Sequence, residues 1–207
     1  MSSCSSTHQA YLRSLDLAFS KPHDFVLESE QIRQSPADLL YVTKGDLGTA
    51  VLALAYIENG QYKWISSDNV ALIEKNGRII KTLSSSSNLD FVTSTSADPL
   101  ENANNITSRS VWQRIVDFEG YFGVEINSTF HVVGVLPLTI QEQTLDAVLI
   151  EEQVNIGDGA LHQFDDTQWT NQFWVHKETG QLLRSRQKLF PNGLYFDMIY
   201  VSRALRL

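Results

Sequence analysis

The 207-residue chain contains a single cysteine, no long apolar run and no excess of positive charge. Because Cys4 is alone, neither an intramolecular disulfide nor a structural zinc site made of thiolates can form. The longest apolar run, Ala50 to Ile57, is far shorter than the roughly 20 residues of a membrane-spanning helix and suits a buried strand. The formal net charge of -8 argues against nucleic acid as a partner, since phosphate binding requires a basic face.

Motifs of catalysis and metal binding are also missing. No two histidines have metal-ligand spacing, and no nucleophile elbow, P-loop or dinucleotide fingerprint occurs. Glu151 and Glu152 are adjacent on a predicted strand, so they point to opposite faces and cannot act together on one substrate. Asp165-Asp166 matches no calcium-loop spacing, which favours a solvated acidic loop. The sequence therefore predicts no enzyme active site, no metal site and no cofactor.

Cys4 lies in a polar, serine-rich stretch, which is an unusual place for a core cysteine. A bacterial lipoprotein carries its lipid on a cysteine that follows a small residue, and Ser3-Cys4-Ser5 fits such a site. Met1 stands where an apolar residue is expected, and the alternative is an incidental cysteine in a disordered tail. We predict that Cys4 is lipidated on a flexible tether, residues 1–7. No charged-then-apolar leader precedes it, so we expect that a signal peptide has been removed.

Short helical patterns precede the rest of the chain. From His8 to Ser20, apolar residues recur at spacings of three and four, which predicts a short amphipathic helix that ends before Pro22. Glu28 to Gln34 predicts a further helical turn or two. We expect the first helix to pack on one face of the fold or across one opening.

Strand patterns joined by tight turns fill the chain from Leu39 onward. Asn59-Gly60 and Asn76-Gly77 are signals of two-residue hairpins, because both central residues of that turn favour positive φ. No strand alternates with a long helix, which excludes a parallel nucleotide-binding sheet. The chain therefore predicts a mainly β fold: an antiparallel meander forming one large curved sheet or barrel-like fold, with residues 8–207 as a single domain. The long strand beginning at Tyr121 is expected to bend at Gly134.

The tryptophans and one row of cations give a candidate surface for a ligand or partner. Trp64 and Trp174 lie in strongly patterned strands typical of a core, whereas the other two tryptophans flank polar loops and are better candidates for exposed, sugar-stacking rings. Three cations lie two residues apart on one strand and share a face, where they would meet acidic sugars or a partner, unless that face is simply solvated. The candidate surface comprises Trp112, Trp169, Arg184, Arg186 and Lys188.

Two blocks of sequence look familiar in combination. Residues 64–69 and 76–82 resemble the pattern W-x-S-x-D-x…N-G-R-(L/I)-x-(K/R)-T, and residues 173–187 resemble F-W-V…T-G-x-(V/L)-x-x-S-R-Q. Asp98-Pro99-Leu100 lies between the two blocks. In this order the segments resemble the YjbF/YmcC (GfcB-like) family of envelope lipoproteins, which is linked to exopolysaccharide and group 4 capsule production.

The resemblance implies a lipoprotein anchored to the outer membrane through its N-terminal lipid and facing the periplasm. It would act in polysaccharide assembly or export, with a polysaccharide or other capsule-export proteins as partners, and it implies no catalytic residues. Arg78 and Thr82 lie on one strand face, and we interpret them as structural. Two alternatives stay open: a carrier of a lipid-like apolar ligand in a sheet cavity, and a glycan hydrolase with two carboxylates across a cleft.

Overall fold

The computed structural model describes residues 26–67, 69–83 and 88–207. The tether, Cys4 and the helix predicted from His8 to Ser20 lie outside these residues. One α-helix, α2 (Ser29–Gln34), begins the described part and agrees with the predicted helical turns there. Its Gln31 side chain accepts a hydrogen bond from the backbone N–H of Glu28, which closes a capping box.

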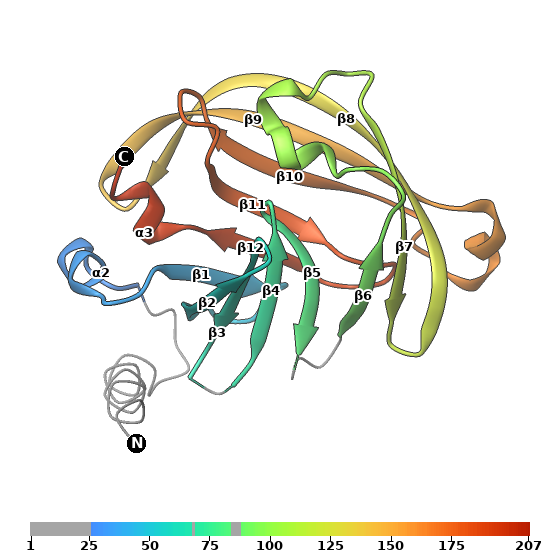
Figure 1. The fold of residues 1–207 in the computed structure, drawn as a ribbon, viewed down its shortest axis with the longest axis horizontal. Coiled ribbons are helices and arrows are strands. Elements are labelled where there is room, and N and C mark those ends of the chain that lie inside the picture. The colour runs from blue at the N-terminus through green and yellow to red at the C-terminus, as the bar shows by residue number, and fades with distance from the viewer. Residues whose placement is uncertain (1–25, 68, 84–87) are drawn as a thin grey trace.

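Twelve antiparallel strands form one sheet that curves round until its two edges approach each other (Figure 1). The order across the sheet is β5-β4-β3-β2-β1-β12-β11-β10-β9-β8-β7-β6, so nearly every neighbour in space is also a neighbour in sequence. This confirms the predicted mainly β, barrel-like meander. The strands are β1 (Leu39–Lys44), β2 (Ala50–Glu58), β3 (Gln61–Ile65), β4 (Ala71–Lys75), β5 (Arg78–Leu83), β6 (Leu89–Thr93), β7 (Val111–Phe118), β8 (Tyr121–Ile140), β9 (Gln143–Ile156), β10 (Gln168–His176), β11 (Leu182–Lys188) and β12 (Tyr195–Ile199).

The edge strands β5 and β6 lie side by side and nearly close the sheet (Figure 1). A side chain joins them, because the backbone N–H of Leu89 donates to the hydroxyl of Thr82 at 2.9 Å. Thr82 is buried, which agrees with its interpretation as a structural residue. The sheet thus leaves little open edge for unwanted strand pairing.

The two predicted Asn-Gly hairpins are confirmed by their backbone angles. Asn59 and Gly60 have φ of 52° and 74°, and Asn76 and Gly77 have φ of 53° and 81°. At Gly77 there is a second reason for glycine, since a Cβ atom there would press on a methyl group of Leu182, which would have to move. The positive φ and the close approach of the β4–β5 turn to β11 therefore both favour glycine.

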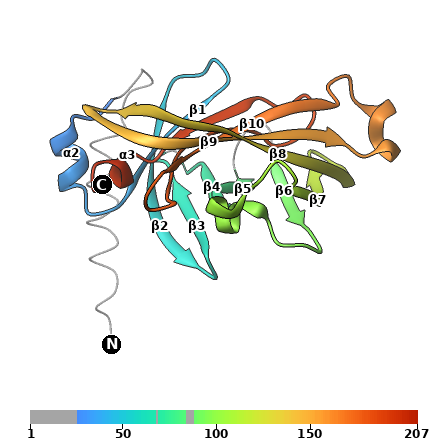
Figure 2. The same cartoon turned by 90° about the horizontal axis from the view of Figure 1, so that it is seen from above.

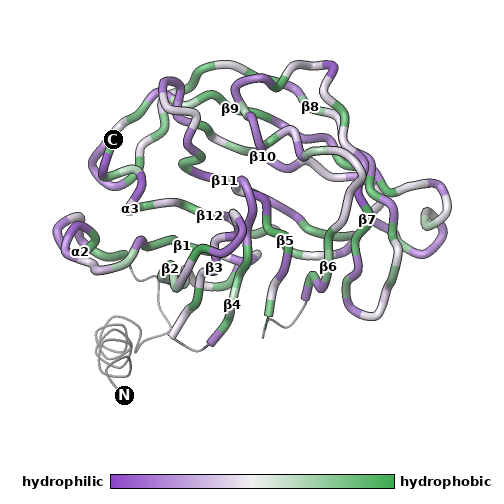
Figure 3. Tube along the Cα trace, viewed as in Figure 1, coloured by the Kyte–Doolittle hydropathy of each residue, from purple (hydrophilic) through white to green (hydrophobic). Residues whose placement is uncertain are grey.

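The inner face of the sheet holds the larger core. Hydrophobic and hydrophilic residues alternate along many of the strands (Figure 3), as expected when one face is buried and the other meets solvent. The core includes Trp64, which is only 2% exposed, as its strand pattern predicts. Phe118 stacks on Phe190 with ring centroids 4.6 Å apart.

A second core covers part of the outer face. Here α2 and the C-terminal helix α3 (Val201–Ala204) lie together at one end of the sheet (Figure 2). Strand β8 reaches both cores: Ile126 and Phe130 belong to the inner core, but Leu138 and Ile140 belong to the outer one. These residues all have even numbers, and a β-bulge between Val132 and Gly134 reverses which face they occupy. The bulge falls where the bend at Gly134 was predicted.

Three details differ from the sequence analysis. Strand β2 is buried only over Val51–Ala53, and Tyr56 and Ile57 are more than half exposed, because this end of the β2–β3 hairpin extends beyond the core. Apolar and polar residues alternate from Leu194 to Val201, which predicts a strand over this whole range. The strand instead ends at Ile199, and the helix α3 begins at Val201. A short 3-10 helix, η2 (Asp158–Gln163), forms within residues 156–168, whose glycines and aspartates indicate a loop. A second one, η1 (Pro99–Asn105), agrees with the pattern of residues 97–109, which indicates either a long loop or a short helix.

Candidate functional site

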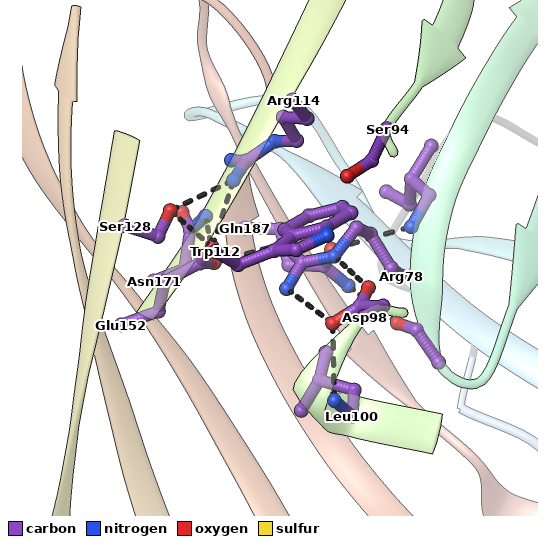
Figure 4. A network of polar contacts seen from close by, with 12 residues as sticks. Arg78, Ser94, Asp98, Leu100, Trp112, Arg114, Ser128, Glu152, Asn171 and Gln187 are labelled. Carbon is purple, nitrogen blue, oxygen red and sulfur yellow. Dashed lines mark hydrogen bonds and ion pairs between the residues drawn. The ribbon is translucent and has the colours of Figure 1, made fainter. Parts of the chain in front are cut away.

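A network of charged side chains lies inside the curved sheet (Figure 4). Its centre is Glu152 on β9, which has no exposed surface. Arg78 on β5 donates to one carboxylate oxygen at 2.9 Å, and Arg114 on β7 donates to the other at 3.1 Å. Ser128 and Asn171 donate at 2.6 and 3.0 Å, so Glu152 accepts four hydrogen bonds. This satisfies the carboxylate fully, as a buried charge requires.

Asp98, just before η1, and Trp112 on β7 complete the network. The Asp98 carboxylate pairs with the guanidinium of Arg78 and also caps η1 by accepting the backbone N–H of Leu100 at 3.0 Å. The guanidinium carbons of Arg78 and Arg114 lie 4.4 and 4.6 Å from the Trp112 ring centroid. Two cations, two carboxylates and an aromatic face therefore balance one another away from water.

Burial and neighbouring charges shift the pKa values of both Glu152 and Arg114. Burial alone would raise the pKa of Glu152, but the adjacent Arg78 and Arg114 reverse that effect and lower it to about 2. Burial lowers the pKa of Arg114 to about 10 despite the opposing effect of Glu152, which leaves this guanidinium charged near neutral pH. Glu152 and Arg114 are thus both charged near neutral pH and form a buried ion pair.

The segments that carry the family resemblance meet around this network. Arg78 comes from the first block and Asp98 from the segment between the blocks, and they pair directly. Gln187, from the second block, donates to the carbonyl of Gly77 at 2.7 Å and accepts the backbone N–H of Ile79 at 3.3 Å. Both arginines of the network are under 5% exposed, which supports the structural interpretation of Arg78.

The two tryptophans predicted as exposed rings are both buried, so this prediction was wrong. Trp112 and Trp169 are each 6% exposed. Although polar loops flank both, each ring points into the core and its indole N–H finds a backbone partner, the carbonyls of Ser96 and Lys188 at 3.3 and 2.8 Å. Neither ring offers a face to an external sugar.

The three cations predicted to form a row on β11 differ in their exposure to solvent. Arg186 is exposed and stacks over Tyr195, whereas Arg184 is partly buried and pairs with Asp197 at 2.5 Å. Lys188 is only 6% exposed, and its ammonium group pairs with Asp166, so the row does not continue to this residue. Arg186 is therefore the most exposed cation of the three.

Glu151 and Glu152 face opposite sides of the sheet, as predicted. Glu151 lies on the outer face and accepts a hydrogen bond from Gln172 at 3.0 Å. Within the described residues, no group of three or more His, Cys, Asp or Glu side chains is arranged to hold a metal ion. No helix in this part of the chain is long and apolar enough to cross a membrane.

A pocket of about 280 Å³ opens at one end of the sheet. It lies between the β4–β5 turn, η1, the β10–β11 turn and α3, so segments far apart in sequence contribute to it. The polar lining consists of Tyr62, Glu74, Asn76, Glu101, Gln181 and Arg203, beside Gly77, Leu100, Ala103, Val175, Gly180 and Leu182. Sequence analysis singled out the Asn76-Gly77 turn but not this pocket, because the segments that line it lie far apart in the sequence.

Two charged residues of the lining, Glu74 and Arg203, pack against buried aromatic side chains. Glu74 is only 1% exposed and accepts a hydrogen bond from the Tyr200 hydroxyl. Burial raises the pKa of the Glu74 carboxyl, while Tyr200 and Arg203 partly oppose the change. The Arg203 guanidinium stacks 4.3 Å from the Tyr200 ring centroid and donates to the Leu182 carbonyl at 2.6 Å. Trp64 meets Tyr200 edge to face at 6.0 Å.

These features define a mainly β protein with a filled, ionic interior and a polar pocket at one end of its sheet. The family model described as "Group 4 capsule polysaccharide lipoprotein gfcB, YjbF" matches residues 12–201. The chain therefore belongs to the YjbF family of group 4 capsule polysaccharide lipoproteins, which confirms the resemblance found in its sequence.

Relatives in Escherichia coli (strain K12) are similar over nearly the whole chain. "Uncharacterized lipoprotein GfcB" is 28% identical over 207 residues, 99% of this chain and 94% of that protein. "Uncharacterized lipoprotein YjbF" is 28% identical over 193 residues, 91% of this chain and 86% of that protein. The crystal structure of the hypothetical lipoprotein YmcC from the same organism has a TM-score of 0.79 at 30% identity and covers 97% of this chain and 96% of that one. The fold and the family are thus shared over most of the chain.

Proposed function

We propose that this protein is a non-catalytic accessory factor of capsule or exopolysaccharide assembly or export. In this proposal it is attached to the outer membrane by a lipid on Cys4 and its sheet faces the periplasm. The observation that carries the proposal is the family match over residues 12–201. Both E. coli relatives are named as lipoproteins, which supports the lipid anchor.

The interior of the sheet favours this role over the carriage of a lipid-like ligand. Packed side chains and the Glu152 network fill the region that a carrier would keep open. The pocket beside Arg78 and Arg114 has a volume of only about 10 Å³, about the space of one water molecule. A carrier of an acyl chain would need a continuous apolar cavity many times larger.

Labelling and complementation in the natural host test the proposal. The full precursor and its Cys4→Ala variant are expressed in a strain that lacks the gene, and palmitate incorporation, membrane fractionation and surface polysaccharide are measured. We expect label and outer-membrane location for the wild type only, and restored polysaccharide mainly with the wild type. An unlabelled wild type would refute the anchor, and normal polysaccharide in the deletion strain would refute the accessory role.

A further inference from the structure

Some polar side chains of the pocket at the end of the sheet do not take part in holding the fold together. Glu101 on η1 and Gln181 in the β10–β11 turn are exposed at its rim, and Asn76 lies on the opposite wall in the β4–β5 turn. Within the described part of the chain, neither Glu101 nor Gln181 makes a side-chain hydrogen bond or ion pair. The rim therefore presents carboxylate and amide groups to whatever enters.

The walls of the pocket are held firmly in place. Gln187 fixes the β4–β5 turn through the Gly77 carbonyl, and Asp98 caps the helix that carries Glu101. On the third side, Arg203 is fixed by its hydrogen bond to the Leu182 carbonyl. A site whose polar groups are ordered in advance loses less conformational entropy when a ligand binds.

The chemistry of the lining indicates the class of ligand. Carboxylates of Glu74 and Glu101 accept hydrogen bonds, the Arg203 guanidinium donates them, and the amides of Asn76 and Gln181 do both. Apolar surface from Leu100 and Val175 lies among these groups. A hydroxyl group both donates and accepts, and the carbon face of a sugar ring is apolar, so a sugar matches this mixture.

We infer that this pocket binds a single uncharged sugar unit of the polysaccharide on which the protein acts. The inference rests on the proposed function for the source of the glycan. The volume of about 280 Å³ lies near the lower end of ligand sites, roughly 300–1,000 Å³, which suits one sugar unit. At the rim an acidic sugar would meet the exposed Glu101 carboxylate, on a chain of net charge -8, and the single guanidinium in the lining, Arg203, is already engaged by the Leu182 carbonyl, so the neutral unit is the one selected.

The test is a titration of the full chain with neutral and acidic oligosaccharide fractions from the host's own polysaccharide. NMR shifts of the lining residues, Glu101 and Gln181 among them, report occupancy and give the dissociation constant. We expect saturable binding of the neutral fraction and no cleavage of it. Glu101→Gln and Gln181→Ala should each weaken binding about tenfold, the loss expected for one hydrogen bond to a charged or well-placed group.

Matched controls lie elsewhere on the surface. Glu142→Gln changes an exposed carboxylate on the β8–β9 turn, and Gln163→Ala changes an exposed amide that lines a different pocket beside Phe122. Both should leave the dissociation constant within about twofold, and circular dichroism should show all four variants folded as the wild type.

The outcomes separate this inference from the proposed function. Binding that is unaffected by the Glu101 and Gln181 variants, or preference for the acidic fraction, would overturn the pocket as the neutral-sugar site. Restored polysaccharide in the host without any binding of the fragments would overturn the inference and leave the accessory role intact. Cleavage of the oligosaccharide would contradict the proposal that the protein binds the sugar without hydrolysing it.

Discussion

Charged side chains occur on both faces of the sheet, but water reaches them to very different extents. Inside, Arg78, Arg114 and Glu152 are between 0% and 4% exposed. Outside, the side chains of Arg184 and Asp197 are 33% and 28% exposed although their atoms are as close, 2.5 Å apart. The distance between the charged atoms therefore does not show how much each ion pair contributes to the stability of the fold. Removing one member of the inner network leaves a charge without water or partner, whereas water and salt replace the outer partner readily.

The largest effect is expected from Glu152→Gln. This change leaves Arg114 with no carboxylate partner in the described interior, and breaking a buried ion pair costs about 3–5 kcal/mol. Urea unfolding followed by tryptophan fluorescence measures the loss. The neighbouring Glu151→Gln, on the outer face, is the control and should cost less than about 1 kcal/mol. Equal losses for the two variants would contradict the distinction between the faces.

Acid should remove the same stabilisation in the wild type. The pKa of Glu152 is lowered to about 2 in the folded protein, against roughly 4.3 for an unfolded glutamate. Its contribution is therefore complete above about pH 4.3 and is lost as the pH falls toward 2, with a total of about 3 kcal/mol. Unfolding measured from pH 6 to pH 2 should show wild type and Glu152→Gln converging. A difference between them that stays constant over this range would be incompatible with the shifted pKa.

The smallest effect is expected on the outer face. Asp197→Asn removes the partner of Arg184, but the pair is about a third exposed and should contribute only about 0–1 kcal/mol. Salt near 1 M should erase most of this difference, because screening acts strongly on exposed charges. Urea unfolding at low and high salt measures both quantities. A loss above about 2 kcal/mol would place this pair in the same class as the inner network.

The strands and turns could be predicted from sequence because their signals are local. Asn59-Gly60 and Asn76-Gly77 fix their own backbone angles, and the bend predicted at Gly134 falls at the β-bulge of β8. The continuation of β8 to Ile140 was harder to predict, since Pro137 interrupts the pattern without ending the strand. Local chemistry thus determined the meander, and long-range pairing determined where the strands end.

The inner network could not be predicted from the same signals. Arg114 lies on β7 between Val111 and Ile115, which are exposed, so the hydropathy pattern of this strand suggests the wrong face for the arginine. Its partner Glu152 lies 38 residues away on β9, and the pairing of β7 and β9 with the two sides of β8 brings both side chains onto one face. The burial of Trp112 has the same origin, because both arginines lie against its ring.

The extra residue at Val133 also determines how the molecule should come apart. Since β8 and β9 contribute side chains to both cores, loss of their whole shared hydrogen-bond ladder would expose apolar groups of both. These two strands therefore link the stability of the inner core to that of the outer core. We expect the amide hydrogens near the bulge, between the two cores, to be among the slowest of the protein to exchange.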